Sequence, residues 1–122
     1  MADARKTGFD KEKEAAKFLT KNGYKIIETN FNTKYGEIDI IAKHKKCLVF
    51  VEVKYRKSSD MGAPQEAVTF QKQQKIIKSA IVYLKQNHIR SDIRFDVAAI
   101  TGGEITVIES AFGLPENKYY GI

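Results

Sequence analysis

The chain has 122 residues, of which 43% are hydrophobic and 30% are charged. This length suits one domain with a buried core, and the composition is that of a folded protein rather than a disordered one. No apolar run approaches the roughly 20 residues of a membrane-spanning helix, and the polar N-terminus does not resemble a signal peptide. The lone cysteine, Cys47, cannot form an internal disulfide, which fits a reducing compartment. We therefore expect a single cytoplasmic domain over residues 1–122, with no membrane partner.

The charge balance is basic, with 21 Lys and Arg residues against 15 Asp and Glu residues and a net charge of +6. Most of the basic excess lies in residues 1–60. Such an excess suggests a polyanionic partner such as a nucleic acid. A lysine-rich solvated surface would give the same balance, so charge alone leaves both interpretations open.

The first half of the chain predicts one helix and three strands. Helical spacing of apolar residues predicts a helix over residues 8–22, with Thr7 as the cap and Asn22-Gly23 as the stop. Runs with strand character cover residues 24–31, 36–43 and 47–56. The last two runs are separated by a polar tip, so we expect them to form a hairpin.

The second half predicts a loop, a helix and two more strands. Residues 57–64 contain serine, glycine and proline and predict a mobile loop. An apolar stripe predicts a helix over 69–87, and two strands over 93–100 and 105–109 flank a Gly-Gly turn. The resulting order, α-β-β-β-α-β-β, predicts an α/β fold in which helices pack on one mixed sheet.

The strand over residues 47–56 carries the first candidate site. Alternate side chains of a strand point to opposite faces, and the odd-numbered residues up to Val53 are all apolar. The even-numbered face begins with Leu48 and Phe50 and ends with Glu52 and Lys54. A strand that is apolar on both faces is typically central, so its charged end should lie at the border of the core.

The preceding strand supplies further acids at the same level. Glu37, Asp39 and Ile41 alternate with Ile38, Ile40 and Ala42, which predicts two opposite faces. In the expected hairpin, Asp39 falls near Glu52 and Glu37 falls toward Lys54. Carboxylate oxygens are the ligands that Mg²⁺ prefers, and such a metal with a neighbouring lysine can activate water at a phosphate. The alternative is a solvated sheet face with cross-strand ion pairs.

Two segments carry a resemblance to a known family. Residues 36–42 (GEIDIIA) and 49–56 (VFVEVKYR) resemble the YraN-like family UPF0102, and further matches at Glu12, Gly23-Tyr24 and 94–97 extend over nearly the whole chain. That family resembles archaeal Holliday-junction resolvases and the PD-(D/E)xK nucleases. The resemblance implies a restriction-endonuclease-like α-β-β-β-α-β core, in which helices flank a mixed central sheet.

The resemblance also implies roles for individual residues. Asp39, Glu52 and Glu12 would bind Mg²⁺ or Mn²⁺, and Lys54 would assist the attacking water. From its place in the hairpin, we expect Glu37 to support the site. The sequence departs from the family pattern at Lys11, which stands where a glycine usually precedes the acid of the first helix. Candidate nucleic-acid contacts are Lys34, Arg56, Lys57 and Lys72.

The function implied is that of an endonuclease that hydrolyses phosphodiester bonds in DNA. No spare helix or ribbon remains to read bases in the major groove, so branched or single-strand-containing DNA is the expected substrate. A homodimer would suit an enzyme that acts on two strands. Two alternatives stay open, because inheritance of activity rests on analogy. The chain could bind nucleic acid without cleaving it, or it could be a protein-interaction domain with an incidental basic surface.

Overall fold

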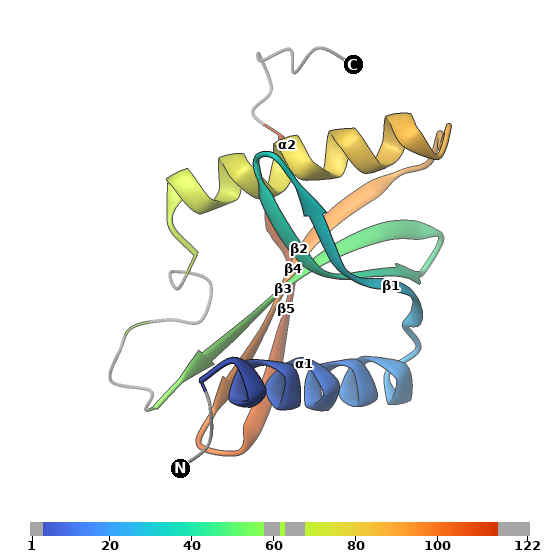
Figure 1. The fold of residues 1–122 in the computed structure, drawn as a ribbon. Helices are drawn as coiled ribbons and strands as arrows, with labels where there is room; N and C mark the ends of the chain where they lie inside the picture. The colour runs from blue at the N-terminus through green and yellow to red at the C-terminus, as the bar shows by residue number, and fades with distance from the viewer. Residues whose placement is uncertain (1–3, 58–61, 63–67, 115–122) are drawn as a thin grey trace.

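The computed structural model describes residues 4–57, 62 and 68–114 (Figure 1). Most of the expected loop over 57–64 therefore lies outside the described residues. The elements are, in chain order, α1 (Ala4–Lys21), β1 (Lys25–Thr33), β2 (Gly36–His44), β3 (Cys47–Arg56), α2 (Phe70–Gln86), β4 (Ile93–Thr101) and β5 (Glu104–Phe112). This is the predicted order, and it confirms the α/β class.

The five strands form one mixed sheet in the order β1-β2-β3-β4-β5. Neighbours are antiparallel except β3 and β4, which run parallel because α2 carries the chain across the sheet between them. Helix α1 covers one face and α2 covers the other, so β3 is the central strand that its two apolar faces predict (Figure 1). Within the described residues, no helix is long and apolar enough to cross a membrane.

Local sequence signals set most of the element ends. The side chain of Thr69 caps α2 by accepting a hydrogen bond from the Lys72 amide. Gly23 follows α1 with a φ of +89°, a left-handed conformation that glycine adopts at little cost. The start of α1 differs from the prediction, because the helix begins at Ala4 and Thr7 is inside it. The Ala, Arg and Lys residues at that end are favourable helix formers and extend the helix past the expected cap.

The core has two layers, one on each side of the sheet. Leu48 and Phe50 of β3 pack in the α2 layer, whereas Val49 and Val51 pack in the α1 layer, as their alternation predicts. Cys47 is partly buried against the α1 layer. Phe50 and Val49 are both fully buried, so the centre of β3 is covered on both faces.

Strand β2 departs from the predicted alternation. Ile38 and Ile41 pack in the α2 layer, whereas Ile40 and Ala42 pack in the α1 layer, so the prediction that Ile38 shares a face with Ile40 is wrong. The alternation is interrupted at Asp39, where the ladder between β2 and β3 stops after the pair Ile40 and Val51.

Beyond that pair the two strands separate. Residues 36–38 of β2 remain paired with β1, and residues 52–56 of β3 remain paired with β4. We call the place where β2 and β3 cease to pair the fork. Asp39 stands at its base.

Candidate metal centre

Asp39 is held at the fork by a backbone contact. Its Oδ2 accepts a hydrogen bond from the amide of Val53 at 2.8 Å. Val53 is two residues past the last paired residue of β3, so the carboxylate substitutes for the carbonyl that a continuing ladder would supply. The pairing of Ile40 with Val51 also puts Asp39 at the level of Glu52, as the hairpin register predicts.

Three carboxylates meet at this point. Glu12 of α1, Glu37 and Asp39 each offer one oxygen atom, and these oxygens lie within 4.8 Å of one another. Two oxygen ligands on opposite sides of one Mg²⁺ or Ca²⁺ are roughly 4–5 Å apart, because each bond is about 2.0–2.6 Å long. The spacing therefore suits a single hard cation.

The electrostatics of Glu12 show how crowded these acids are. Burial, followed by the charges of Asp39 and Glu37, raises the pKa of Glu12 to about 7. A side-chain hydrogen bond from Asn30 acts in the opposite direction. Asn30 has a φ of 55°, a left-handed conformation that asparagine tolerates better than most residues. Nothing in a strand pattern marks this residue, and sequence reasoning gave it no role at the site.

Glu52 lies on the other side of Asp39. It is only 8% exposed, its Oε1 is 3.9 Å from Nζ of Lys72, and its Oε2 is buried without a hydrogen-bond partner. Burial, followed by the charge of Asp39, raises the pKa of Glu52 to about 8, while Lys72 and Lys54 lower it. Burial also raises the pKa of Asp39, against the opposing hydrogen bond from the Val53 amide.

The predicted acids thus surround Asp39, but not on one face of the sheet. Glu12 reaches the fork from α1, whereas Glu52 continues the α2 side of β3 and is not one of the three acids whose oxygens lie within 4.8 Å of each other. The reason is the divergence of β2 from β3, which opens the sheet at Asp39 and lets both helices contribute. The expectation of a single polar sheet face is corrected accordingly.

The predicted cationic residues fall into three environments. Lys34, Lys54 and Lys57 are exposed, and Lys54 is close enough to Glu52 to influence its charge. Lys72 forms an ion pair with Glu52, so it lies within the candidate metal centre rather than around it. Arg56 is only 5% exposed; its guanidinium donates to the Gly62 carbonyl and its Nε has no partner. Such burial does not fit the expected surface contact of Arg56 with a phosphate.

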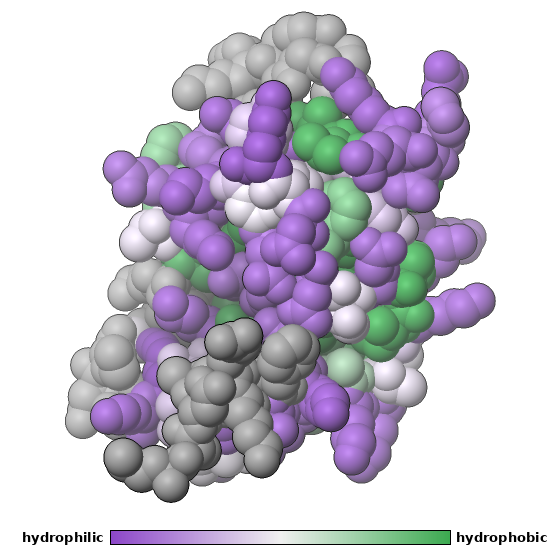
Figure 2. Space-filling view, viewed as in Figure 1, coloured by the Kyte–Doolittle hydropathy of each residue, from purple (hydrophilic) through white to green (hydrophobic). Residues whose placement is uncertain are grey.

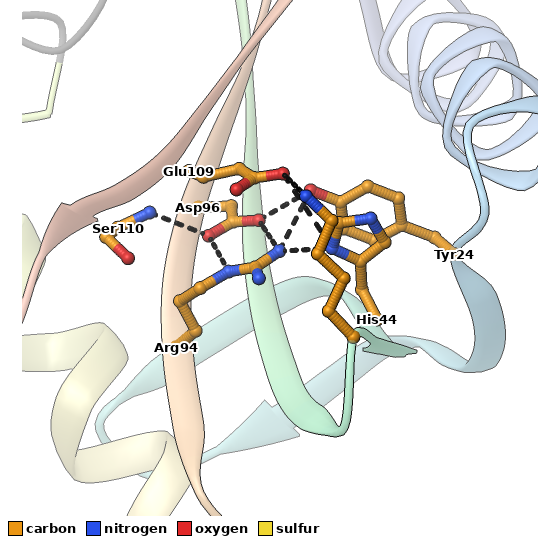
Figure 3. A network of polar contacts seen from close by, with 7 residues as sticks. Tyr24, His44, Arg94, Asp96, Glu109 and Ser110 are labelled. Atoms are coloured by element: carbon orange, nitrogen blue, oxygen red, sulfur yellow. Dashed lines mark hydrogen bonds and ion pairs between the residues drawn. The ribbon is translucent and has the colours of Figure 1, made fainter.

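A second polar cluster lies on the α1 side of the sheet, toward the start of β3 (Figure 3). Asp96 is fully buried and accepts hydrogen bonds from the Tyr24 hydroxyl at 2.7 Å, Arg94 Nε at 2.9 Å and the Ser110 amide at 3.0 Å. Arg94 and Asp96 thus form a buried ion pair, with Arg94 Nη2 2.9 Å from Asp96 Oδ2. The ring of His44 stacks on Tyr24 with centroids 3.9 Å apart, and its Nδ1 is 2.7 Å from Arg94 Nη2. Because every member has partners, the cluster stabilises the fold rather than offering a vacant site.

The chain is similar to known proteins over most of its length. The model of the family described as "Uncharacterised protein family UPF0102" matches residues 11–100. A UPF0102 protein of Sulfurihydrogenibium is 42% identical over 104 residues, covering 84% of this chain and 90% of that protein. One of Lachnoclostridium phytofermentans is 45% identical over 107 residues, covering 86% and 91%. The crystal structure of SSO0001 is similar with a TM-score of 0.48 and 19% identity, covering 94% of this chain and 55% of that one, so this chain spans about half its length.

Proposed function

The chain belongs to the UPF0102 family, and from that premise we propose that it is a metal-dependent endonuclease that hydrolyses phosphodiester bonds in DNA. One observation carries the proposal: Glu12, Glu37 and Asp39 bring carboxylate oxygens within 4.8 Å of one another at the fork. Proteins seldom gather three partly buried acids without a compensating cation, because each ionised group raises the cost of the next.

The donor set fits Mg²⁺ or Mn²⁺. All the converging side-chain donors are hard oxygens, and neither a thiol nor an imidazole is among them. The buried Oε2 of Glu52 has no hydrogen-bond partner, although buried polar atoms almost always have one. Glu12, Glu37 and Asp39 would hold the metal, with Glu52 beside Asp39 as a further donor. When bound, a divalent cation lowers the pKa of water and stabilises negative charge on the phosphate.

The lysines supply the remaining parts of the chemistry. Lys54 is exposed, neighbours Glu52 and can donate to a phosphoryl oxygen or orient the attacking water. Lys72 lies 3.9 Å from Glu52 and offsets part of the negative charge of that carboxylate. Lys34 and Lys57 are exposed and contribute sequence-independent contacts to phosphates.

We propose branched or single-strand-containing DNA as the substrate, cut with little sequence preference. The described chain is a sheet with two helices that both pack on it, so it offers no free helix for the major groove. The face shown in Figure 2 is mainly hydrophilic, with apolar patches that are small and separate. A homodimer would present two such centres to two strands.

The test is a cleavage assay on end-labelled DNA of equal length: a four-way junction, a flap, a single strand and duplexes of varied sequence. Each substrate is incubated with Mn²⁺, with Mg²⁺ or with EDTA at fixed salt. We expect metal-dependent cleavage of the branched or single-stranded substrates, and none by the Asp39→Asn or Glu52→Gln variants. Asp92→Asn is the matched control, because Asp92 is exposed beside Leu48, about 13 Å along β3 from Glu52.

Three outcomes would contradict the proposal. Equal cleavage by wild type and Asp39→Asn would point to a contaminating nuclease. Cleavage of plain duplex as fast as of the junction would remove the proposed substrate selectivity. Tight, salt-dependent DNA binding without cleavage under any metal would favour a nucleic-acid-binding module on the same fold.

A further inference from the structure

Three aromatic side chains are exposed among the residues whose side chains the structure describes. Tyr35 is 37% exposed, Tyr55 is 47% exposed and Phe70 is 64% exposed. Single apolar residues are common on protein surfaces, so exposure alone carries no argument. The positions of these three residues relative to the fork do support an argument.

Each of the three residues is close in sequence to a residue of the candidate metal centre. Tyr35 is in the β1–β2 turn, two residues before Glu37, and Tyr55 follows Lys54 directly on β3. Phe70 opens α2 two residues before the lysine that contacts Glu52. Two residues span only about 7 Å on a strand and less on a helix. The exposed aliphatic residues of the described chain, by contrast, are at the start of β1 and beyond the end of β5.

The rings stand on both sides of the sheet. The ammonium group of Lys11, on α1, lies 4.8 Å from the centroid of the Tyr55 ring. The ammonium group of Lys78, on α2, lies 5.6 Å from the Tyr35 ring, and Phe70 belongs to the same helix. Aromatic rings are therefore available beside both helices, on opposite faces of the sheet.

Aromatic rings accompanied by lysines suit one kind of ligand. Single-stranded nucleic acids bind to grooves in which bases stack on aromatic rings while cations hold the backbone. Lys34 is 5.2 Å from the Tyr35 ring and gives that ring a second cation. Bases inside a duplex have both faces covered by their neighbours, so exposed rings can stack only on bases that are already unpaired or splayed out.

We propose that Tyr35, Tyr55 and Phe70 stack on unpaired bases on either side of the bond to be cut. This deepens the proposed function by naming its substrate: a single-stranded segment that crosses the fork, either free or at a branch. The proposal concerns binding and rests on the proposed nuclease function only for the statement that a bond there is cut.

The experiment measures binding of fluorescent oligothymidine and of a blunt hairpin duplex with equal phosphate count, by anisotropy in EDTA at fixed salt. Tyr55→Leu, Tyr35→Leu and Phe70→Leu remove the rings but keep apolar side chains of similar size. Each should weaken oligothymidine binding about tenfold and leave duplex binding within twofold. Tyr55→Phe and Tyr35→Phe keep the rings and should bind as wild type. Ile27→Ala, an exposed apolar change away from the fork, is the control for lost apolar surface.

Urea denaturation of each variant checks that the fold is retained. The inference is overturned if the leucine variants bind oligothymidine like wild type, or if they lose affinity for the duplex by the same factor. It is also overturned if wild type binds no oligothymidine, which would leave the rings to a protein partner. Because the assay contains no divalent metal, its result does not depend on cleavage. If the leucine variants bind oligothymidine like wild type and wild type shows metal-dependent cleavage, the nuclease function is supported and only the stacking role is excluded.

Discussion

Replacing Glu52 by glutamine should stabilise the metal-free protein above neutral pH and leave its stability almost unchanged in mild acid. Glu52 is 8% exposed, close to Asp39, and has one oxygen without a hydrogen-bond partner. Ionising it therefore costs free energy that the metal-free fold does not recover. Glutamine has the same shape and no charge, so the variant isolates the cost of the charge.

The magnitude follows from the pKa of Glu52, which rises from 4.5 to about 8 on folding. A carboxyl group with a raised pKa favours the folded state while it is protonated. That contribution is complete below about pH 4.5 and is lost as the pH rises to about 8. One pKa unit corresponds to about 1.4 kcal/mol, so the whole shift would be about 5 kcal/mol. Asp39 shares the repulsion, so the effect of Glu52 alone is smaller. We expect the unfolding free energy of the variant minus that of wild type to increase by about 2–3 kcal/mol between pH 5 and pH 8.

Urea denaturation in EDTA, at one-unit steps from pH 5 to pH 9, measures this difference. The quantity of interest is the unfolding free energy of Glu52→Gln minus that of wild type, plotted against pH. It should rise with pH and level off above pH 8. Glu104→Gln makes the same chemical change at an exposed position at the start of β5 and is the matched control. A loss of several kcal/mol at every pH would show that Glu52 is a structural residue and would refute the reasoning.

Three further predictions concern the metal, the lysines and the second polar cluster. Calorimetric titration should detect Mn²⁺ binding to wild type but not to Asp39→Asn, and equal binding by both would contradict the metal centre. Lys54→Ala should abolish cleavage while DNA affinity stays within about twofold of wild type. Lys34→Ala and Lys57→Ala should each reduce the slope of log affinity against log salt concentration by about one. An unchanged slope would exclude these two lysines from the interface. Asp96→Ala should cost about 3–5 kcal/mol in urea denaturation, because it leaves a poorly solvated guanidinium unpaired, while cleavage per folded molecule stays unchanged.

Much of the fold could be predicted from the residues alone. The bounds of β3 match the prediction because apolar residues on both faces and a charged end leave few alternatives. The end of α1 and the start of α2 were found because Gly23 and Thr69 act locally, through backbone conformation and capping. The start of α1 was missed because helix propensity extended past a residue that could have capped it.

The candidate site could be predicted from the sequence only in part. The level of Asp39 opposite Glu52 follows from hairpin register, which is local. The divergence of the strands does not follow from hydrophobic alternation, because it occurs where the Asp39 carboxylate takes the place of a ladder carbonyl as acceptor of the Val53 amide bond. Alternation therefore predicted one polar face where the protein has a fork. Glu12 entered only through the family resemblance, and the place of Lys72 beside Glu52 depends on tertiary packing that no short pattern encodes.

Asp39 is part of both the fork and the cluster of acids at its base. A side chain that accepts the Val53 amide bond ends the β2–β3 ladder without leaving a buried donor unsatisfied, so the strands can separate there at little cost. An asparagine could accept the same bond and would remove the charge of Asp39, which acts together with burial, the larger cause, to raise the pKa of both Glu12 and Glu52. The fold alone would thus be at least as stable with an amide at this position. A carboxylate gains an advantage only when a cation balances the charges around it, and that is the physical reason why we propose a metal-binding role for Asp39 and not a purely structural one.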